Sequence, residues 1–352
     1  MLGTKTNAKR PQNASPMKHI LHASAALALL LSSILPAISA EPVTVDTFVR
    51  AETDMTFGRY AKQGGFGKLL HIRQATPIDK QDVIRMNRDT LYSLGIFDLT
   101  TPVTIVKPAS EGRFQSMLVI NQDHSMRPVE HGAGEFTFTQ EQIGSRYVIV
   151  LFRTFADAND PADIKAANAL QDKIAVRQAQ AGKFEIPDWD EVSLKKVRDA
   201  INILAATRTD TKGMFGDKAK LNPIGHLLGA AYGWGGNPKE AAVYDNVVPT
   251  KNDGKTPYAV TVKDVPVDGF WSITVYNKDG FMEKNAQNVY SYNNVTAKKN
   301  ADGSITIHFG GGPKAINNLP ITPGWNYAVR MYQPRPEIIN GSWSFPKAQP
   351  AE

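Results

Sequence analysis

The sequence contains no cysteine among its 352 residues. This excludes disulfides, a thiolate nucleophile, and cysteine ligands for zinc or an iron–sulfur cluster. Long runs of like charge are also absent, and no hydrophobic run reaches the roughly 20 residues of a membrane-spanning helix. The remaining composition, 42% hydrophobic and 21% charged, is typical of a globular protein with a sizeable core. The length suggests two domains, or one large domain with an insertion.

The first 40 residues have the pattern of a secretory signal peptide. They contain four basic residues and no acidic one, followed by an apolar stretch over 25–35 and a short segment ending in Ser39-Ala40. We expect cleavage after Ala40 or Ser39, export to the periplasm or the medium, and no stable membrane anchor afterwards. Met17 is an alternative start, so that either Met1 or Met17 begins the chain.

Removal of this segment changes the charge balance. It takes away four of the 40 basic residues and none of the 34 acidic ones, so the formal charge falls from +6 to +2. No basic stripe remains, which argues against nucleic-acid binding. The expected partner is a small-molecule ligand, and the sequence does not indicate an oligomeric state. Because export would permit disulfides, their absence means that the fold depends on its core.

Hydrophobic periodicity predicts a mixed α+β fold. After a helix over 44–62, short β-branched and aromatic runs predict strands at 94–97, 103–106, 114–120, 136–139 and 147–152. Helices follow at 161–175, at 190–204 and after Asn222-Pro223. Further strands are expected at 258–262, 270–276, 289–295, 304–309 and 325–332. We therefore expect a strand-rich N-terminal domain (41–157), a helical insert (158–236) and a C-terminal antiparallel β-sandwich (237–347).

Two strands resemble each other at an offset of 156 residues. The pattern F-x-S-x-x-V-x-N-x-D begins at Phe114 and again at Phe270. Both copies predict a strand that runs into a turn held by the asparagine side chain. A duplication and a chance match of strand and turn chemistry both explain this pattern.

Two longer stretches resemble a known family. Residues 85–93 read R-M-N-R-D-T-L-Y-S, and residues 265–276 read V-P-V-D-G-F-W-S-I-T-V-Y. The second stretch is followed by Asn285, Asp302-Gly303-Ser304, Leu319-Pro320, Gly324-Trp325, Arg330 and Trp343. The sequence is similar to exported bacterial proteins with tandem domains of unknown function, DUF1254 and DUF1214. The resemblance implies a mixed fold with a β-sandwich-like C-terminal half, and it implies no reaction.

The densest polar cluster lies within the first of these stretches. Arg85, Asn87, Arg88, Asp89 and Tyr92 precede or begin a predicted strand. An arginine offers two donors to a carboxylate or phosphate, and an aspartate accepts from a hydroxyl. This pattern indicates an anion or sugar site, or else an internal Arg–Asp pair that fixes the end of the strand.

The loop after the strand at 114–120 offers acid–base groups. Asp123 and His124 would act as orienting carboxylate and general base. An alternative is a metal site made of His124, Glu130 and His131. A solvated loop with a turn-forming residue is the simpler alternative, because no metal-binding motif is present.

Our hypothesis is that the protein binds a small polar or anionic molecule in a cleft between its two strand-rich halves. The predicted catalytic residues are Asp123, His124 and Asp89, and the predicted substrate-binding residues are Arg88, Asn87, Tyr92, Trp234 and Arg330. The reaction would be hydrolysis, and the rival hypothesis is a non-catalytic cell-envelope protein. The sequence leaves open whether the protein is an enzyme.

No metal or organic cofactor is predicted. The Gly-rich stretch 64–68 resembles a phosphate loop, but Lys62 stands where a glycine is needed and Leu69 replaces the serine or threonine. No G-x-S-x-G or G-x-G-x-x-G motif is present either.

Overall fold

The N-terminal half is built around two long strands that pair along their full length. In the computed structural model, which describes residues 40–81, 84–208 and 210–351, β2 (Thr90–Asp98) runs antiparallel to β6 (Tyr147–Phe155). Strands β1 (Leu70–His71) and β4 (Gln115–Asn121) complete a sheet in the order β1-β2-β6-β4. Every residue of β4 and β6 is buried, in agreement with the apolar runs at 117–120 and 147–152.

Alternate residues of β6 face two different layers. Val148, Val150 and Phe152 pack on a second sheet, ordered β5-β3-β7, that consists of β5 (Gly134–Phe138), β3 (Val103–Lys107) and β7 (Ala175–Gln178). Ile149 and Leu151 pack on the other side, toward Phe57 of helix α2 (Phe48–Tyr60). The sheet is therefore covered on both faces.

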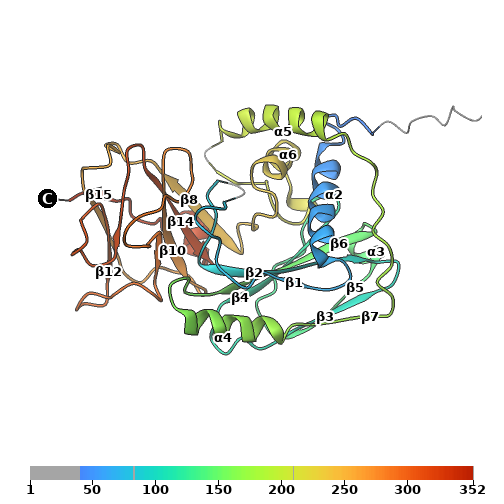
Figure 1. Cartoon of the computed structure of the whole chain (residues 1–352), viewed down its shortest axis with the longest axis horizontal. Coiled ribbons are helices and arrows are strands. Elements are labelled where there is room, and N and C mark those ends of the chain that lie inside the picture. The colour runs from blue at the N-terminus through green and yellow to red at the C-terminus, as the bar shows by residue number, and fades with distance from the viewer. Residues whose placement is uncertain (1–39, 82–83, 209, 352) are drawn as a thin grey trace, which may run out of the picture. The chain divides into compact units, whose positions relative to one another are not determined.

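Helices flank this sheet at both sides (Figure 1). Helices α2, α5 (Glu191–Ala205) and α6 (Pro223–Tyr232) lie on one side, and α4 (Pro161–Asp172) lies on the other. Asp160 and Asn222 cap α4 and α6, each with a proline directly after the cap, as the sequence predicts. Helix α2 continues into a π-helical turn (Ala61–Gly65), where Gly64 adopts a φ of 94°.

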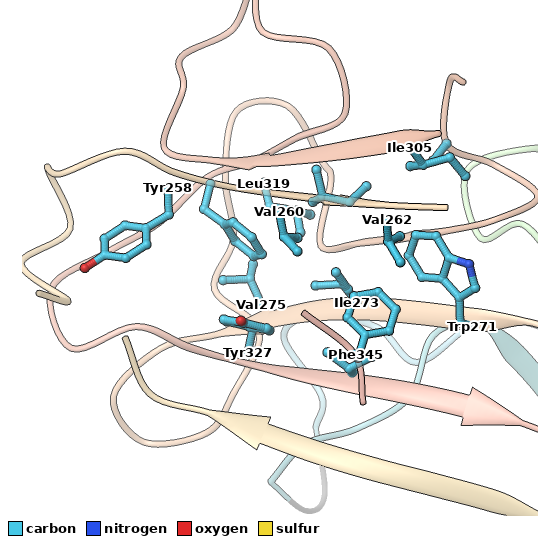
Figure 2. Close-up of a cluster of buried hydrophobic side chains, with 14 of the residues drawn as sticks. Tyr258, Val260, Val262, Trp271, Ile273, Val275, Ile305, Leu319, Tyr327 and Phe345 are labelled. Atoms are coloured by element: carbon cyan, nitrogen blue, oxygen red, sulfur yellow. The ribbon is translucent and has the colours of Figure 1, made fainter. Parts of the chain in front are cut away.

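The C-terminal half is a sandwich of two sheets. One is ordered β11-β10-β14-β8 and the other β13-β12-β9-β15. Their strands are β8 (Ala242–Val247), β9 (Tyr258–Val262), β10 (Trp271–Tyr276), β11 (Ser291–Asn293), β12 (Ile305–Phe309), β13 (Asn318–Leu319), β14 (Asn326–Tyr332) and β15 (Gln349–Pro350). Figure 2 shows side chains such as Val260 and Ile273 pointing into the space between the sheets. All pairings are antiparallel except that of β12 with β13.

The structure confirms the mixed α+β class and the two-sheet C-terminal half. The prediction of a helix through residue 175 is wrong at its end, because α4 stops at Asp172 and Ala175 begins β7. The segment expected as a helical insert thus also supplies a strand to an N-terminal sheet. Residues 42–352 form one compact unit, and the proposed division into domains stays a prediction.

The remaining short elements are α3 (Gln140–Ile143), a 3₁₀ turn (Lys218–Lys220) and α7 (Pro336–Asn340). Within the described ranges, no helix combines the length and apolar character that crossing a bilayer requires.

The outer face of the β10–β14 pair is polar but buried. Ser272, Thr274 and Arg330 have at most 4% of their surface exposed, although they point away from the sandwich core. The segment at residues 85–89 covers this face, through the hydrogen bonds described below. The structure therefore joins the two halves through polar side chains.

Candidate functional site

The two sequence stretches that resemble a known family lie against each other. The Tyr276 hydroxyl donates to the Met86 carbonyl oxygen at 2.9 Å, and Arg330 donates to the Arg85 carbonyl oxygen at 2.8 Å. Arg85 in turn donates to the side chain of Asn326 at 3.0 Å. The N-terminal stretch is thus held by the outer face of the C-terminal sheet.

Asp89 lies at the centre of this contact and is 2% exposed. Its Oδ1 atom accepts hydrogen bonds from Ser291 at 3.2 Å and from Asn293 at 3.3 Å. Burial raises the pKa of Asp89, and the charge of Arg330 and these hydrogen bonds act against the rise. The Ser272 hydroxyl also helps to lower the pKa of Asp89. Neither Ser272 Oγ nor Asp89 Oδ2 has a partner at good hydrogen-bond geometry.

The hydrogen-bond partners of Arg330 are uncharged. Its guanidinium donates to Thr274 at 2.9 Å and to the Tyr276 hydroxyl at 2.6 Å. Burial alone would lower the pKa of Arg330, but Tyr276 and the Asp89 carboxylate raise it above its usual value. The side chain therefore stays a cation inside the protein.

Asn87 and Tyr92 extend the cluster toward the N-terminal sheet. Asn87 donates to the hydroxyl of Tyr332 at 3.1 Å. The ring of Tyr92 lies 5.7 Å from the guanidinium of Arg153, which is the residue that pairs with it across β2 and β6. The structure thus brings Asn87, Asp89, Tyr92 and Arg330 to one junction, and their role in binding stays a prediction.

Sequence reasoning missed Arg153. It is 7% exposed and donates to Asn237 at 2.9 Å and to the Gly235 carbonyl oxygen at 2.7 Å. Among the described residues it forms no ion pair. Residues 147–155 are apolar apart from Arg153 and Thr154. A charged residue in such a strand was the signal that could have revealed Arg153.

Arg88 points away from the cluster. Its guanidinium donates to the carbonyl oxygen of Thr76 and lies 5.4 Å from the ring of Tyr290. The chain bends at Asp89, whose N–H donates to the Asn87 side chain at 2.8 Å, and Arg88 and Asp89 occupy different environments.

Asp123, His124 and Trp234 form a second group beneath α2 and α6. Asp123 pairs with Arg50, with 3.1 Å between Nε and Oδ1. His124 accepts a hydrogen bond from the Gly235 N–H at 3.0 Å, and its ring lies 5.3 Å from that of Trp234. Asp123 therefore does not orient His124, and no hydrogen bond between described residues joins His124 to Asp89.

His124 is fully enclosed. It stacks on His226 with the ring centres 5.6 Å apart. Burial, with a smaller contribution from His226, lowers the pKa of His124 to about 3, so that the ring is neutral. No three histidine or carboxylate side chains within the described ranges gather closely enough to hold a metal.

A cavity of about 670 Å³ lies beside the junction and is lined from both halves. Arg113, Phe114 and Asp163 line it from the N-terminal half, and Asp268 and Phe270 from the C-terminal half. None of the eight site residues predicted from the sequence lines it, although the structure describes all of them.

Aromatic rings connect this cavity to the buried polar cluster. The ring of Phe114 lies 5.1 Å from that of Phe270, and Phe270 stacks on Tyr332 with 4.4 Å between the ring centres. Tyr332 carries the hydroxyl to which Asn87 donates. One aromatic wall therefore separates the cavity from the junction network.

Comparison with known proteins now identifies the family. The model of a protein of unknown function, DUF1254, matches residues 66–178, and that of DUF1214 matches residues 245–336. The chain belongs to the family of tandem DUF1254–DUF1214 proteins. In this family member, Phe114 lies in the DUF1254 region and Phe270 in the DUF1214 region, so that each region supplies one wall of the cavity.

One solved structure shows the same fold. The VPA0106 protein from Vibrio parahaemolyticus matches with a TM-score of 0.67 at 20% identity, over 88% of this chain and 98% of that one. An uncharacterized protein from Burkholderia cenocepacia matches with a TM-score of 0.48 at 11% identity, over 86% of each chain. No curated protein matches the DUF1254–DUF1214 chain.

Proposed function

We propose that this DUF1254–DUF1214 protein binds a small, polar, uncharged molecule in the cavity between its two domain regions. The observation that carries the proposal is the cavity of about 670 Å³ with walls from both regions. Its volume is within the range of about 300–1,000 Å³ usual for ligand sites, which often lie at domain junctions. The exposed rim residues Glu111 and Lys173 leave it open to solvent.

The charges around the cavity support an uncharged ligand over an anionic one. Arg113 pairs with Asp163 at 2.6 Å, and Asp268 pairs with Arg335 at 2.7 Å. Glu111 and Lys173, which also line the cavity, carry opposite charges. The lining thus carries two positive charges, on Arg113 and Lys173, against three negative ones, on Glu111, Asp163 and Asp268, which disfavours an anion. Phe114 offers an apolar surface for a sugar-like or aromatic face.

The environment of the acidic groups supports binding over hydrolysis. Arg113 lowers the pKa of Asp163, which disfavours proton uptake by this carboxylate. Burial, with a contribution from Lys107, lowers the pKa of His131 to about 4. Of the three residues predicted for catalysis, Asp89 and His124 are at most 2% exposed, and Asp123 is paired with Arg50. The proposal is therefore a non-catalytic binding protein.

The proposed site of action is the periplasm or the medium. This rests on the signal-peptide pattern of residues 1–40, all but the last of which lie outside the described residues. The proposed partner is a small molecule, with no nucleic acid involved, because the charge without these residues is close to balanced.

The test is a thermal-shift screen of the purified protein with size-matched compounds. One set contains neutral sugars, polyols and aromatic alcohols, and the other contains carboxylates and phosphates. We expect stabilisation by members of the neutral set. Ligand stabilisation rises as the logarithm of concentration over the dissociation constant, so a titration yields the affinity.

A blocked cavity provides the matched control. Ala166 is exposed on α4 and lines the cavity, whereas the neighbouring Lys165 is exposed on the same helix and does not. We expect Ala166→Trp to abolish the ligand-dependent shift and Lys165→Trp to preserve it. Equal shifts in both variants would show that the ligand binds elsewhere and would refute the proposal.

A further inference from the structure

A second, smaller pocket lies at the edge of the N-terminal sheets. Its volume is about 290 Å³, and it lies between the residues that follow helix α2 and strand β7. Lys68 and His71 line one side, and Val176 and Gln178 of β7 line the other. Lys68 and Ala181 are exposed at its rim, so that small solutes have access. This volume is just below the range of about 300–1,000 Å³ for drug-sized ligands, which suits a ligand of only a few atoms.

The lining of this pocket carries a positive charge with no counter-charge. Lys68 is its ionised residue, and no aspartate or glutamate lines it. Lys68 forms no ion pair with any described residue. This contrasts with the larger cavity, whose lining contains three carboxylates beside its two cationic residues.

His71 is fixed by a chain of hydrogen bonds behind the pocket. The Gln171 Nε2 atom lies 3.0 Å from the Tyr92 carbonyl oxygen and 3.0 Å from the Ser93 hydroxyl oxygen. A carbonyl oxygen only accepts, so this Gln171 atom is the donating amide nitrogen. Ser93 therefore accepts from Gln171, and Nδ1 of His71, at 2.7 Å, is the one acceptor that the described residues offer to the Ser93 hydroxyl hydrogen.

This chain sets the tautomer of His71. Burial, followed by the charge of Arg73, lowers the pKa of His71, which favours the neutral ring. A neutral ring that accepts at Nδ1 carries its hydrogen on Nε2. Nε2 makes no hydrogen bond with a described residue and is not among the enclosed atoms that lack a partner, so that it is accessible at the pocket that His71 lines.

We propose that this pocket binds a small carboxylate, which accepts hydrogen bonds from the Lys68 ammonium group and from the His71 Nε2–H. A carboxylate is an acceptor-only anion and matches two donors and one positive charge. A phosphate fits less well, because the Gly67 N–H that a phosphate loop would offer donates to the Ile96 carbonyl oxygen at 2.9 Å. The Gly-rich stretch 64–68, which fails as a phosphate loop, thus supplies the cationic wall of a simpler site.

The test is side-chain NMR of the ¹⁵N-labelled full chain. Long-range ¹H–¹⁵N spectra report which imidazole nitrogen carries the hydrogen, and we expect the Nε2–H form for His71. Sodium acetate is then titrated against sodium chloride at constant ionic strength, with sodium phosphate in a parallel titration. Acetate is expected to shift the His71 signals in a saturable way, whereas chloride leaves them unchanged and phosphate binds more weakly.

A pair of lysine variants supplies the control. Lys68 and Lys62 are both exposed, and only Lys68 lines the pocket. We expect Lys68→Gln to weaken acetate binding by roughly fivefold or more, as for a lost charge-assisted hydrogen bond, and Lys62→Gln to leave it unchanged. An Nδ1–H tautomer, the absence of a saturable acetate shift, or equal effects of both variants would each overturn the proposal. Phosphate binding as tight as acetate binding would overturn the choice of a carboxylate.

Discussion

At the scale of single residues, His124 shows how a turn determines the position of a functional candidate. Asn121 accepts hydrogen bonds from the backbone N–H groups two and four residues later, and Asn277 does the same in the C-terminal half. His124 and Gly280 occupy the same place in these turns, with φ values of 57° and 87°. The predicted asparagine turns are confirmed, whereas a duplication stays a prediction.

The burial of His124 predicts a pH-dependent stability. Its pKa is about 3 in the folded chain and near 6.5 when unfolded, so that between these values the unfolded chain binds the extra proton. The free energy of unfolding therefore rises with pH across this window. We expect His124→Gln, which retains an acceptor for the Gly235 N–H, to flatten this dependence. Urea denaturation at a series of pH values measures it, and unchanged slopes would contradict the assignment.

At the scale of elements, we expect the buried polar face of β10 and β14 to contribute strongly to the free energy of unfolding. Arg330 and Asp89 interact inside the junction, and removal of one partner leaves the other charge buried without compensation. We expect Arg330→Met to lower the free energy of unfolding by about 3 kcal/mol or more. Chemical denaturation provides the measurement.

The control for this variant is a surface arginine. Arg177 forms an ion pair with Glu135, and both side chains are more than half exposed. Arg177→Met is expected to change stability by less than about 1 kcal/mol. Similar losses in the two variants would mean that the junction network does not hold the two halves together.

Strand β2 contains a glycine for a steric reason. A Cβ atom on Gly95 would lie 2.7 Å from the Lys68 carbonyl oxygen and 2.9 Å from the Phe97 ring. We expect Gly95→Ala to destabilise the protein by about 1–3 kcal/mol, because the 66–68 segment must move away. Gly132→Ala, where a Cβ meets nothing within 4 Å, serves as the control in the same thermal denaturation series. Equal melting temperatures would contradict this close approach.

The sequence was informative about long elements and less so about short ones. The helix predicted at 190–204 is α5, and the strand predicted at 258–262 has the bounds of β9. Two-residue strands such as β1 have no period to detect. Strand β7 was absorbed into a predicted helix, because Ile174 and Ala175 continue the spacing of α4.

The site could be predicted in part for a similar reason. Asp89 and Arg330 are chemically conspicuous, and the structure places them together. The cavity is lined by Phe114 and Phe270, whose proximity arises only when segments 156 residues apart pack. No local pattern encodes such a contact.

At the scale of the whole molecule, the N-terminal pattern predicts the mature form. Cleavage after Ala40 leaves Glu41 as the first residue, and cleavage after Ser39 leaves Ala40. We expect protein recovered from the periplasm or the medium to begin at one of these two residues, which intact mass and N-terminal sequencing detect. Recovery of the full 352-residue chain from the cytoplasm alone would contradict export.

We propose that two regions of the chain jointly form one ligand site. Hydrogen–deuterium exchange, with and without the most stabilising compound of the thermal-shift screen, tests it most directly. We expect slower exchange in the walls from both halves, at residues 109–115 and 268–270, and no such protection in Ala166→Trp. Protection confined to one half, or located away from these segments, would contradict it.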